Sequence, residues 1–224
     1  MNKTVAFLLP LFFAACLVFA ENIVDKVQVF INLPSPETKG KISLEETIAK
    51  RRSIRNYSDK KLSLKELGQL LWAAQGITAG WGGRTVPSAG ATYPLEIYVA
   101  AGNVDFLKPG LYHYKPGYHN LEKILDGDIR KKLCDAALGQ KWIEKAPATI
   151  IIAADFSRTR KRYGERGTRY VFIEAGHAGQ NIYLQSEALG LGTVAIGAFD
   201  DNQVKDILKI KDDVLYLMPV GKKP

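Results

Sequence analysis

The segment ATIIIAADF, residues 148–156, limits the available folds more than any other part of the sequence. It is almost uniformly apolar and rich in β-branched residues, and it lacks the alternation of a strand with one face in water. Such a strand is expected in a sheet that has other elements packed against both of its faces. Because helical segments and further strands alternate along the rest of the chain, the sequence predicts an α+β fold in which helices flank a central mixed, mostly antiparallel sheet.

Local patterns place the other elements. Helices are predicted to begin after Ser43 and after Ser63, since a glutamate follows each serine three residues later, as in a capping box. The longest helical stretch is 167–190, with small residues clustered in its middle. The periodicity predicts further helices at 128–139 and 200–210, strands at 95–101, 110–116, 193–199 and 214–221, and a short edge strand or turn at 119–125.

The first twenty residues differ in kind from the rest. A lysine precedes the apolar run VAFLLPLFFAACLVFA, which ends in the small residue Ala20. This arrangement is typical of a secretory signal that is cut after Ala20. Two alternatives stay open, a lipoprotein-type cut before Cys16 and an uncleaved anchor, for which the run is short. We therefore expect residues 1–20 to be a signal peptide or membrane anchor, and the protein to be exported or, alternatively, membrane-anchored.

Residues 21–42 include NLPSPETKG, which is rich in proline, serine and glycine, and they are predicted to be a linker. The remaining residues, 43–224, then form one domain that is long enough for a substantial core. Of the two cysteines in the chain, only Cys134 lies in this domain, so the fold is expected to hold without an internal disulfide.

Several function classes are disfavoured. The formal net charge is +8, but the basic residues are dispersed, and no zinc-finger, RNP-like or basic-helix pattern accompanies them, so nucleic-acid binding is not predicted. The histidines and cysteines lack metal-ligand spacing, and no metal site is predicted. The sequence has neither the G-x-S-x-G of serine hydrolases nor the G-x-G-x-x-G of Rossmann dinucleotide sites.

The segment RRSIR ends the first predicted helix and contains Arg51, Arg52, Ser53 and Arg55. A guanidinium group can grip phosphate oxygens in pairs, and the serine hydroxyl adds a short donor. Cations at the C-terminus of a helix also complement its dipole without any ligand. From spacing alone, a phosphate site and a solvated helix end are equally favoured.

The loop PSAGATYP, residues 87–94, sets small residues just before a predicted strand. Such residues suit a plain turn, and they equally suit a flat ligand that lies against exposed backbone. The segment GLGTVAIGAF, residues 190–199, also has two interpretations. Its small residues suit a flat ligand that lies against the backbone, or they suit a tightly packed interior strand without a ligand.

Taken together and in this order, RRSIRNYSDKKLSLKELGQLLWAAQGIT, PSAGATYPLEIYV, EAGHAGQNIYLQSEALGLGTVAIGAFDD and LYLMPVG resemble the nitroreductase superfamily. More narrowly, they are similar to its SagB-type or thiazole-oxidase-like branch. The resemblance runs from about Ser43 to Gly221. It implies a nitroreductase-like flavoprotein, a homodimer in which two subunits share their FMN sites.

The resemblance also implies roles for particular residues. The RRS-x-R residues would contact the phosphate and ribityl chain, namely Arg51, Arg52, Ser53 and Arg55. The PSAG residues would come from the other subunit, namely Pro87, Ser88, Ala89 and Gly90. The backbone beside the flavin ring would be that of Ile196, Gly197 and Ala198.

In the family an amide at this strand end points at flavin N5, the atom that exchanges hydride, so Gly197 and Ala198 are the catalytic candidates. Many relatives close on the phosphate with a later arginine or lysine, for which Lys222 or Lys223 is the counterpart here. Some nitroreductases have a glutamate where this chain has Gly197, so substrate recognition is expected to differ.

The expected function is that of an FMN-dependent oxidoreductase. It would take electrons from a transient donor such as NAD(P)H and pass them to a small nitro- or quinone-like acceptor, in a ping-pong scheme. One alternative is a SagB-like dehydrogenase or oxidase that acts on a peptide or heterocycle substrate. Another, from a different class, is an exported module that binds anionic surfaces through its basic cluster.

Overall fold

The structure, a computed structural model, describes residues 28–224. The predicted signal or anchor segment, residues 1–20, and the first part of the predicted linker lie outside the described residues. Among residues 28–224, no helix combines the length and the apolar character needed to cross a membrane.

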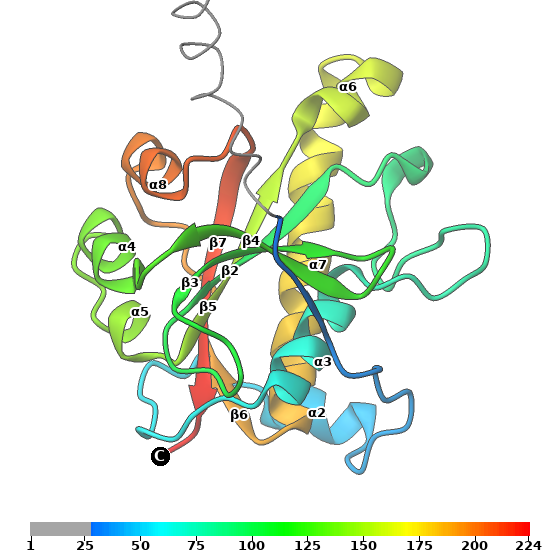
Figure 1. Cartoon of the computed structure of the whole chain (residues 1–224). Helices are drawn as coiled ribbons and strands as arrows, with labels where there is room; N and C mark the ends of the chain where they lie inside the picture. The colour runs from blue at the N-terminus through cyan, green and yellow to red at the C-terminus, as the bar shows by residue number, and fades with distance from the viewer. Residues whose placement is uncertain (1–27) are drawn as a thin grey trace, which may run out of the picture.

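Within residues 28–224 the strands form one seven-stranded sheet in the order β1-β4-β3-β2-β5-β7-β6, and neighbouring strands are antiparallel (Figure 1). The strands are β1 (Phe30–Asn32), β2 (Leu95–Ala101), β3 (Gly110–Lys115), β4 (Asn120–Asp126), β5 (Ala148–Ala154), β6 (Leu191–Thr193) and β7 (Asp213–Lys222). The interior strand β5 runs between β2 and β7, and all of its residues are buried. The prediction of an α+β fold around this strand is confirmed.

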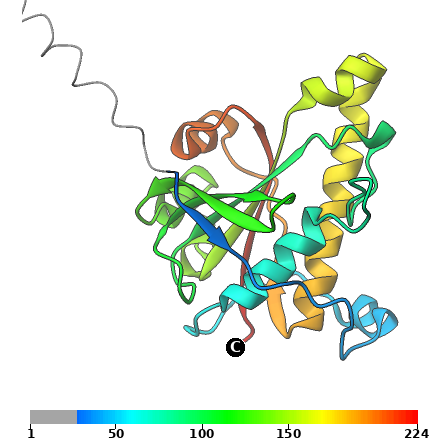
Figure 2. The same ribbon diagram turned by 45° about the vertical axis from the view of Figure 1, so that its right-hand side comes forward.

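Helices cover both faces of the sheet (Figures 1 and 2). The helical segments are α2 (Leu44–Lys50), α3 (Leu64–Gln75), the short η1 (Ala89–Ala91), α4 (Arg130–Ala136), α5 (Trp142–Lys145), α6 (Phe156–Tyr163), α7 (Arg166–Ala188) and α8 (Asp201–Leu208). On one face, α3 and α7 pack over Ile150 and Ile152. On the other, α4, α5 and α8 pack over Ile151, and the free thiol of Cys134 is buried there.

Capping residues in the sequence explain where several of the helices begin and end. Ser63 and Glu66 make both hydrogen bonds of a capping box at the start of α3. Asp200 caps α8 through the backbone N–H of Gln203 at 2.9 Å. Gly76 is the C-cap of α3, and a residue without a side chain fits there because a Cβ would lie 2.2 Å from the Trp72 ring.

Three sequence predictions are wrong in part. The predicted linker contains β1, which pairs with β4, and the next residue, Leu33, is buried. The segment 119–125 is consequently an inner strand, since β1 supplies the edge. The predicted strand 193–199 is displaced: β6 ends at Thr193, and beyond it only Ile196 bridges to Leu217. In each case the pairing partner is distant in sequence, so local composition does not reveal it.

Candidate functional site

Tyr183 of α7 joins two of the predicted site segments. Its Oη lies 2.9 Å from Ser53 Oγ and accepts a 2.8 Å hydrogen bond from the backbone N–H of Ala195. Either hydroxyl can be the donor between Tyr183 and Ser53, so these two hydroxyls and the Ala195 N–H form one continuous hydrogen-bonded chain. The backbone N–H of Ile54 donates to Thr193 O at 2.9 Å and fixes the same two segments together.

The arginines of the RRSIR segment differ in placement. The Arg51 guanidinium lies over the Tyr183 ring, 5.0 Å from its centre, and Arg52 donates to the carbonyls of Ala49 and Arg51. Arg55 lies over Trp142 of α5 instead, at 5.7 Å. Within residues 28–224 none of the three forms an ion pair with a carboxylate. This end of α7 therefore gathers positive charge that an anion can neutralise.

The segment with the catalytic candidates follows directly. Ile196 is buried and exchanges two backbone hydrogen bonds with Leu217 of β7, at 2.9 and 3.0 Å. Gly197 and Ala198, which come next, are exposed. A Cβ at Gly197 would meet only the Tyr216 ring, at 3.7 Å. The main chain here is anchored on one side and open on the other, as close approach of a flat ring requires.

The PSAG loop lies elsewhere in the chain. Its Ser88 Oγ accepts from the backbone N–H of Tyr93 at 2.9 Å, and the carbonyl of Gly90 accepts from Arg162 at 2.9 Å. Gly90 has φ +60°, and a Cβ there would lie 2.6 Å from Tyr163 Oη, so glycine is required. Ser88 lies beside Glu174 of α7, about 13 Å of helix rise from Tyr183. One chain thus brings Arg51, Ser53 and the 196–198 segment together but keeps the PSAG loop apart.

The two C-terminal lysines have different partners. Lys222 pairs with Glu66 at the start of α3. Lys223 Nζ lies 2.7 and 2.8 Å from the carboxylate oxygens of Glu187, one turn of α7 beyond Tyr183. A phosphate role for Lys222 stays a prediction, and Lys223 lies nearer to the Tyr183 end of α7.

Sequence reasoning missed a buried polar cluster under the PSAG loop. Arg84 donates to Gln75 Oε1 at 2.7 Å, and Glu174, only 2% exposed, faces Ser88, Arg84 and Gln75. Burial raises the pKa of Glu174 to about 7, although those three neighbours lower it in part. Glu174 Oε1 has no hydrogen-bond partner among residues 28–224. The signs in the sequence are Arg84, which lies close before the PSAG loop and suits either a ligand contact or an exposed loop charge, and an acidic residue within the small-residue stretch of the longest helix.

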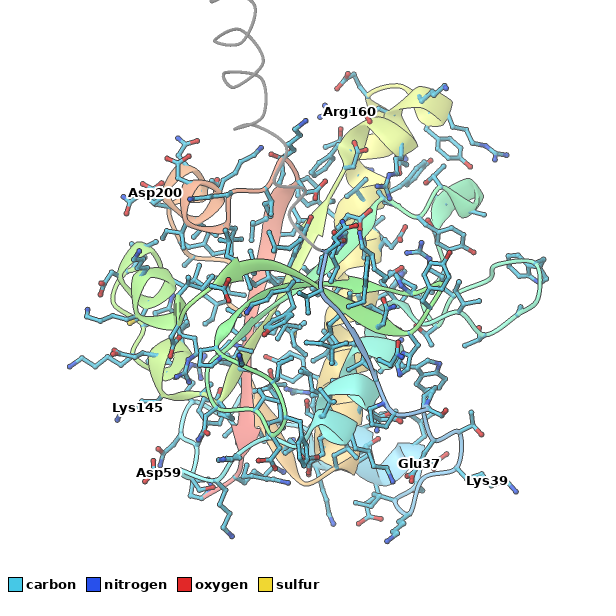
Figure 3. The ribbon with its side chains drawn as sticks, viewed as in Figure 1. Glu37, Lys39, Asp59, Lys145, Arg160 and Asp200 are labelled. Carbon is cyan, nitrogen blue, oxygen red and sulfur yellow. The ribbon has the colours of Figure 1, made fainter. Side chains whose placement is uncertain are left out.

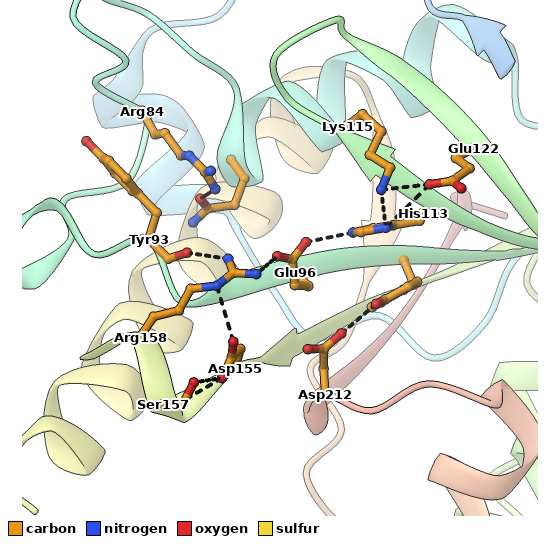
Figure 4. A network of polar contacts seen from close by, with 12 residues as sticks. Arg84, Tyr93, Glu96, His113, Lys115, Glu122, Asp155, Ser157, Arg158 and Asp212 are labelled. Atoms are coloured by element: carbon orange, nitrogen blue, oxygen red, sulfur yellow. Dashed lines mark hydrogen bonds and ion pairs between the residues drawn. The ribbon is translucent and has the colours of Figure 1, made fainter. Parts of the chain in front are cut away.

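A second polar network attaches α6 to the sheet (Figure 4). Arg158 donates to Glu96 and to the carbonyl of Tyr93, and His113 Nε2 lies 2.6 Å from Glu96. Because the Lys115 ammonium can only donate to His113 Nδ1, at 2.9 Å, the His113 Nε2–H donates to Glu96. Burial raises the pKa of Glu96, but the bonds to His113 and Arg158 outweigh it, and the net shift is downward.

A groove of about 580 Å³ opens beside Gly197, between α6, α7 and α8. Its aromatic lining residues are Phe156, Phe172, Phe199 and Tyr216. Unpaired guanidiniums beside an open stretch of backbone suit a flat, phosphorylated ligand, and an adjoining aromatic groove suits a second flat molecule. The arrangement is therefore suited to hold a flat, phosphorylated cofactor and a second flat ligand next to each other.

Comparison with known proteins gives the family. The nitroreductase family model matches residues 48–222, and the chain belongs to this family. A protein of Methanocaldococcus jannaschii that is assigned by name to the nitroreductases is 51% identical over 193 residues, 86% of this chain and 96% of that protein. The crystal structure of a protein assigned to the nitroreductases from Ralstonia eutropha JMP134 superposes with a TM-score of 0.76 at 29% identity, covering 87% of this chain and 90% of that one.

Two further relatives bear on the chemistry. An FMN reductase [NAD(P)H] of Bacillus subtilis is 24% identical over 188 residues, 79% of this chain and 62% of the reductase. The microcin B17-processing protein McbC of Escherichia coli is 26% identical over 162 residues, 69% of this chain and 60% of McbC. With the family established, the chain is an oxidoreductase of the flavoprotein class.

Proposed function

We propose that the protein is an FMN-dependent oxidoreductase that transfers electrons from NAD(P)H to a small nitro- or quinone-like acceptor in a ping-pong scheme. When bound, FMN supplies the redox chemistry, since its N5 accepts and returns a hydride. The observation that carries the proposal is the contact of Tyr183 with both Ser53 and Ala195. Through this contact Ser53 and Arg51, the proposed phosphate ligands, lie close to the segment that exposes the backbone of Gly197.

In this proposal the residues act by binding and orientation. The Arg51 guanidinium and the Ser53 hydroxyl hold the phosphate, since hydrogen bonds to an ionised group are the stronger kind. The backbone of Ile196, Gly197 and Ala198 lies along the ring, and the N–H groups of Gly197 and Ala198 are the donors toward its redox edge. The pairing of Ile196 with Leu217 keeps this segment in place.

The proposal includes a homodimer. A single chain holds the PSAG loop, Pro87 to Gly90, away from Ser53, so a second copy is needed to complete the site. Helices α2 and α7 also carry large apolar side chains on their surface: Leu44 is 60% exposed, Ile48 55% and Ile173 48%. Exposed apolar side chains along two neighbouring helices are typical of an interface between subunits.

FMN titration tests the proposal on the full chain. We expect a yellow protein of dimeric mass that binds one FMN per subunit and loses its flavin absorbance with NADH or NADPH. Arg51→Gln is expected to weaken FMN binding roughly tenfold, because it removes one charge-assisted contact. Lys60→Gln, which removes an exposed charge from the segment after the cluster, is the matched control and should leave the affinity unchanged. A colourless, monomeric protein that takes up no FMN would contradict the proposal.

Tyr183→Phe tests the contact directly. Loss of the hydroxyl leaves the Ala195 N–H without its acceptor and lets Ser53 rotate, so FMN affinity should fall about fivefold, near 1 kcal/mol. Stability should fall by a similar amount. The check is FMN titration together with urea unfolding of the flavin-free protein, and equal FMN affinity in wild type and variant would show that Ser53 does not depend on Tyr183.

A second candidate function is oxidation of a peptide or heterocycle, as in the SagB-type branch, and similarity to the microcin B17-processing protein favours it. It predicts that FMN binds but that neither NADH nor NADPH reduces it. A flavin-free protein that binds anionic vesicles would instead support the surface-binding alternative. We also propose export through residues 1–20. The mass of the mature chain, determined after expression in its own host, distinguishes a cut after Ala20 from a retained anchor.

A further inference from the structure

Helix α6 forms one wall of the groove beside Gly197, and this helix is unusually basic. Its sequence, FSRTRKRY, holds Arg158, Arg160, Lys161 and Arg162. Arg158 is engaged by Glu96 and by the Tyr93 carbonyl (Figure 4), and Arg162 donates to the Gly90 carbonyl. Of these four, only Arg160 lines the groove.

The Arg160 guanidinium is held but not neutralised. Its Nε donates to Thr168 Oγ1 at 2.9 Å, and its carbon lies 5.4 Å from the centre of the Phe156 ring. Within residues 28–224 it has no ion pair, and its two terminal nitrogens make no hydrogen bond. Positioned by Thr168 and Phe156, these nitrogens form a fork suited to an anion with two oxygens, such as a carboxylate.

The opposite wall, from α8 and β7, has another charge pattern. Lys205 of α8 pairs with Asp213 at 2.9 Å, so these two charges offset each other, and Asp201 adds a carboxylate. Figure 3 shows Arg160 on α6 and Asp200, the residue before α8, at the same end of the molecule. The groove therefore attracts anions at α6 and repels them at α8, which gives a bound anion one preferred end.

Between these ends the groove is aromatic. Phe156 and Phe172 meet edge to face with ring centres 5.4 Å apart, and Phe199 and Tyr216 line the part near Gly197. Tyr216 is also the side chain that a Cβ on Gly197 would meet. A flat conjugated molecule in the groove would therefore extend from Arg160 toward the open backbone at Gly197.

We propose that this groove is the acceptor site and that it selects flat, conjugated acceptors carrying a carboxylate or similar anionic group, which Arg160 binds. The inference rests on the proposed function, because it takes the backbone of Gly197 to mark where the redox edge of bound FMN would lie. Arg160 sets specificity and takes no part in electron transfer. For a nitroaromatic acid the balanced reaction consumes NADH, a proton and the nitro compound, and yields NAD⁺, the nitroso compound and water.

The test compares 4-nitrobenzoate with the neutral, nearly isosteric 4-nitrobenzamide. The wild-type enzyme should show a KM about tenfold lower for the acid. Arg160→Gln should raise the KM for 4-nitrobenzoate about tenfold, without changing kcat or the KM for 4-nitrobenzamide, since one charge-assisted contact is lost. Lys161→Gln removes the neighbouring, exposed charge of α6 that does not line the groove, and it should behave as wild type.

A binding measurement separates the two proposals. Calorimetry of 4-nitrobenzoate with the oxidised FMN protein should show the same tenfold loss in Arg160→Gln. The acceptor assignment is overturned if Arg160→Gln lowers the affinity for 4-nitrobenzoate and 4-nitrobenzamide equally. It is also overturned if this substitution changes only the KM for NADPH. If the protein binds FMN and NADH bleaches it, but acid and amide are used alike, this inference fails while the proposed function stands. If the protein takes no FMN yet binds the acid through Arg160, both the proposed function and the acceptor role fall.

Discussion

Replacing Glu174 with glutamine is expected to stabilise the protein by about 3 kcal/mol at pH 8 and to leave its stability at pH 4 nearly unchanged. Burial raises the pKa of this carboxyl from an ordinary 4.5 to about 7. Between these two values the unfolded chain releases the proton and the folded chain keeps it. The contribution of Glu174 is therefore fully present below about pH 4.5 and is lost as the pH rises to about 7. Glutamine keeps the shape without ionising.

Urea unfolding of both proteins between pH 4 and pH 8 measures this difference. Other carboxyls, such as Glu96 and Glu66, have lowered pKa values and give the opposite trend, so the informative quantity is wild type minus variant at each pH. Glu165→Gln, at an exposed position before α7, is the matched control and should change stability by less than about 0.5 kcal/mol at every pH. A difference that does not vary with pH would mean that Glu174 does not titrate in this range.

Glu174 also shows which part of the site the sequence could reveal. Arg51, Ser53 and Gly197 lie in short motifs. Spacing alone left binding and structural interpretations of these motifs open, and the resemblance to the nitroreductases implied the phosphate and flat-ring roles. Tyr183 and Glu174 lie inside one long helix whose periodicity gives only its buried and exposed faces. That Tyr183 meets Ser53, and that Glu174 meets Ser88 and Arg84, depends on how α7 crosses the rest of the molecule.

The same distinction holds for the fold. Helix α3 was predicted at its observed position because Ser63 and Glu66 act locally at its start and Gly76 acts locally at its end. Strand β1 was missed because Phe30–Asn32 is specified by pairing with β4, some ninety residues later. The segment 193–199 alternates like a strand, yet its regular pairing with β7 stops at Thr193, Ile196 makes one isolated bridge to Leu217, and Gly197 is exposed. The segment of interest for function, residues 196–198, thus lies where the local sequence pattern predicts a strand and the observed backbone is not a regular one.

Substitutions in the central strand β5 are expected to have the second large effect, which is on the free energy of unfolding. Ile151→Ala and Ile152→Ala are each expected to lower the free energy of unfolding by about 3–4 kcal/mol, because each removes buried methyl and methylene groups and leaves a cavity. Ile151 packs toward α4 and α8, and Ile152 toward α3 and α7. Both side chains are fully buried. Adjacent residues of a strand point to opposite faces, so only a sheet covered on both sides makes both substitutions equally costly.

Urea unfolding of the two alanine variants therefore measures the cover on each face separately. Ile151→Val and Ile152→Val serve as matched variants and should lose about 1 kcal/mol each, since one methylene is removed. If either alanine variant failed to fold, its valine counterpart would still report the cost at that face. A sheet with one solvated face would give one costly position and one nearly neutral one. That result would contradict the burial of β5 from which the two-sided architecture is derived.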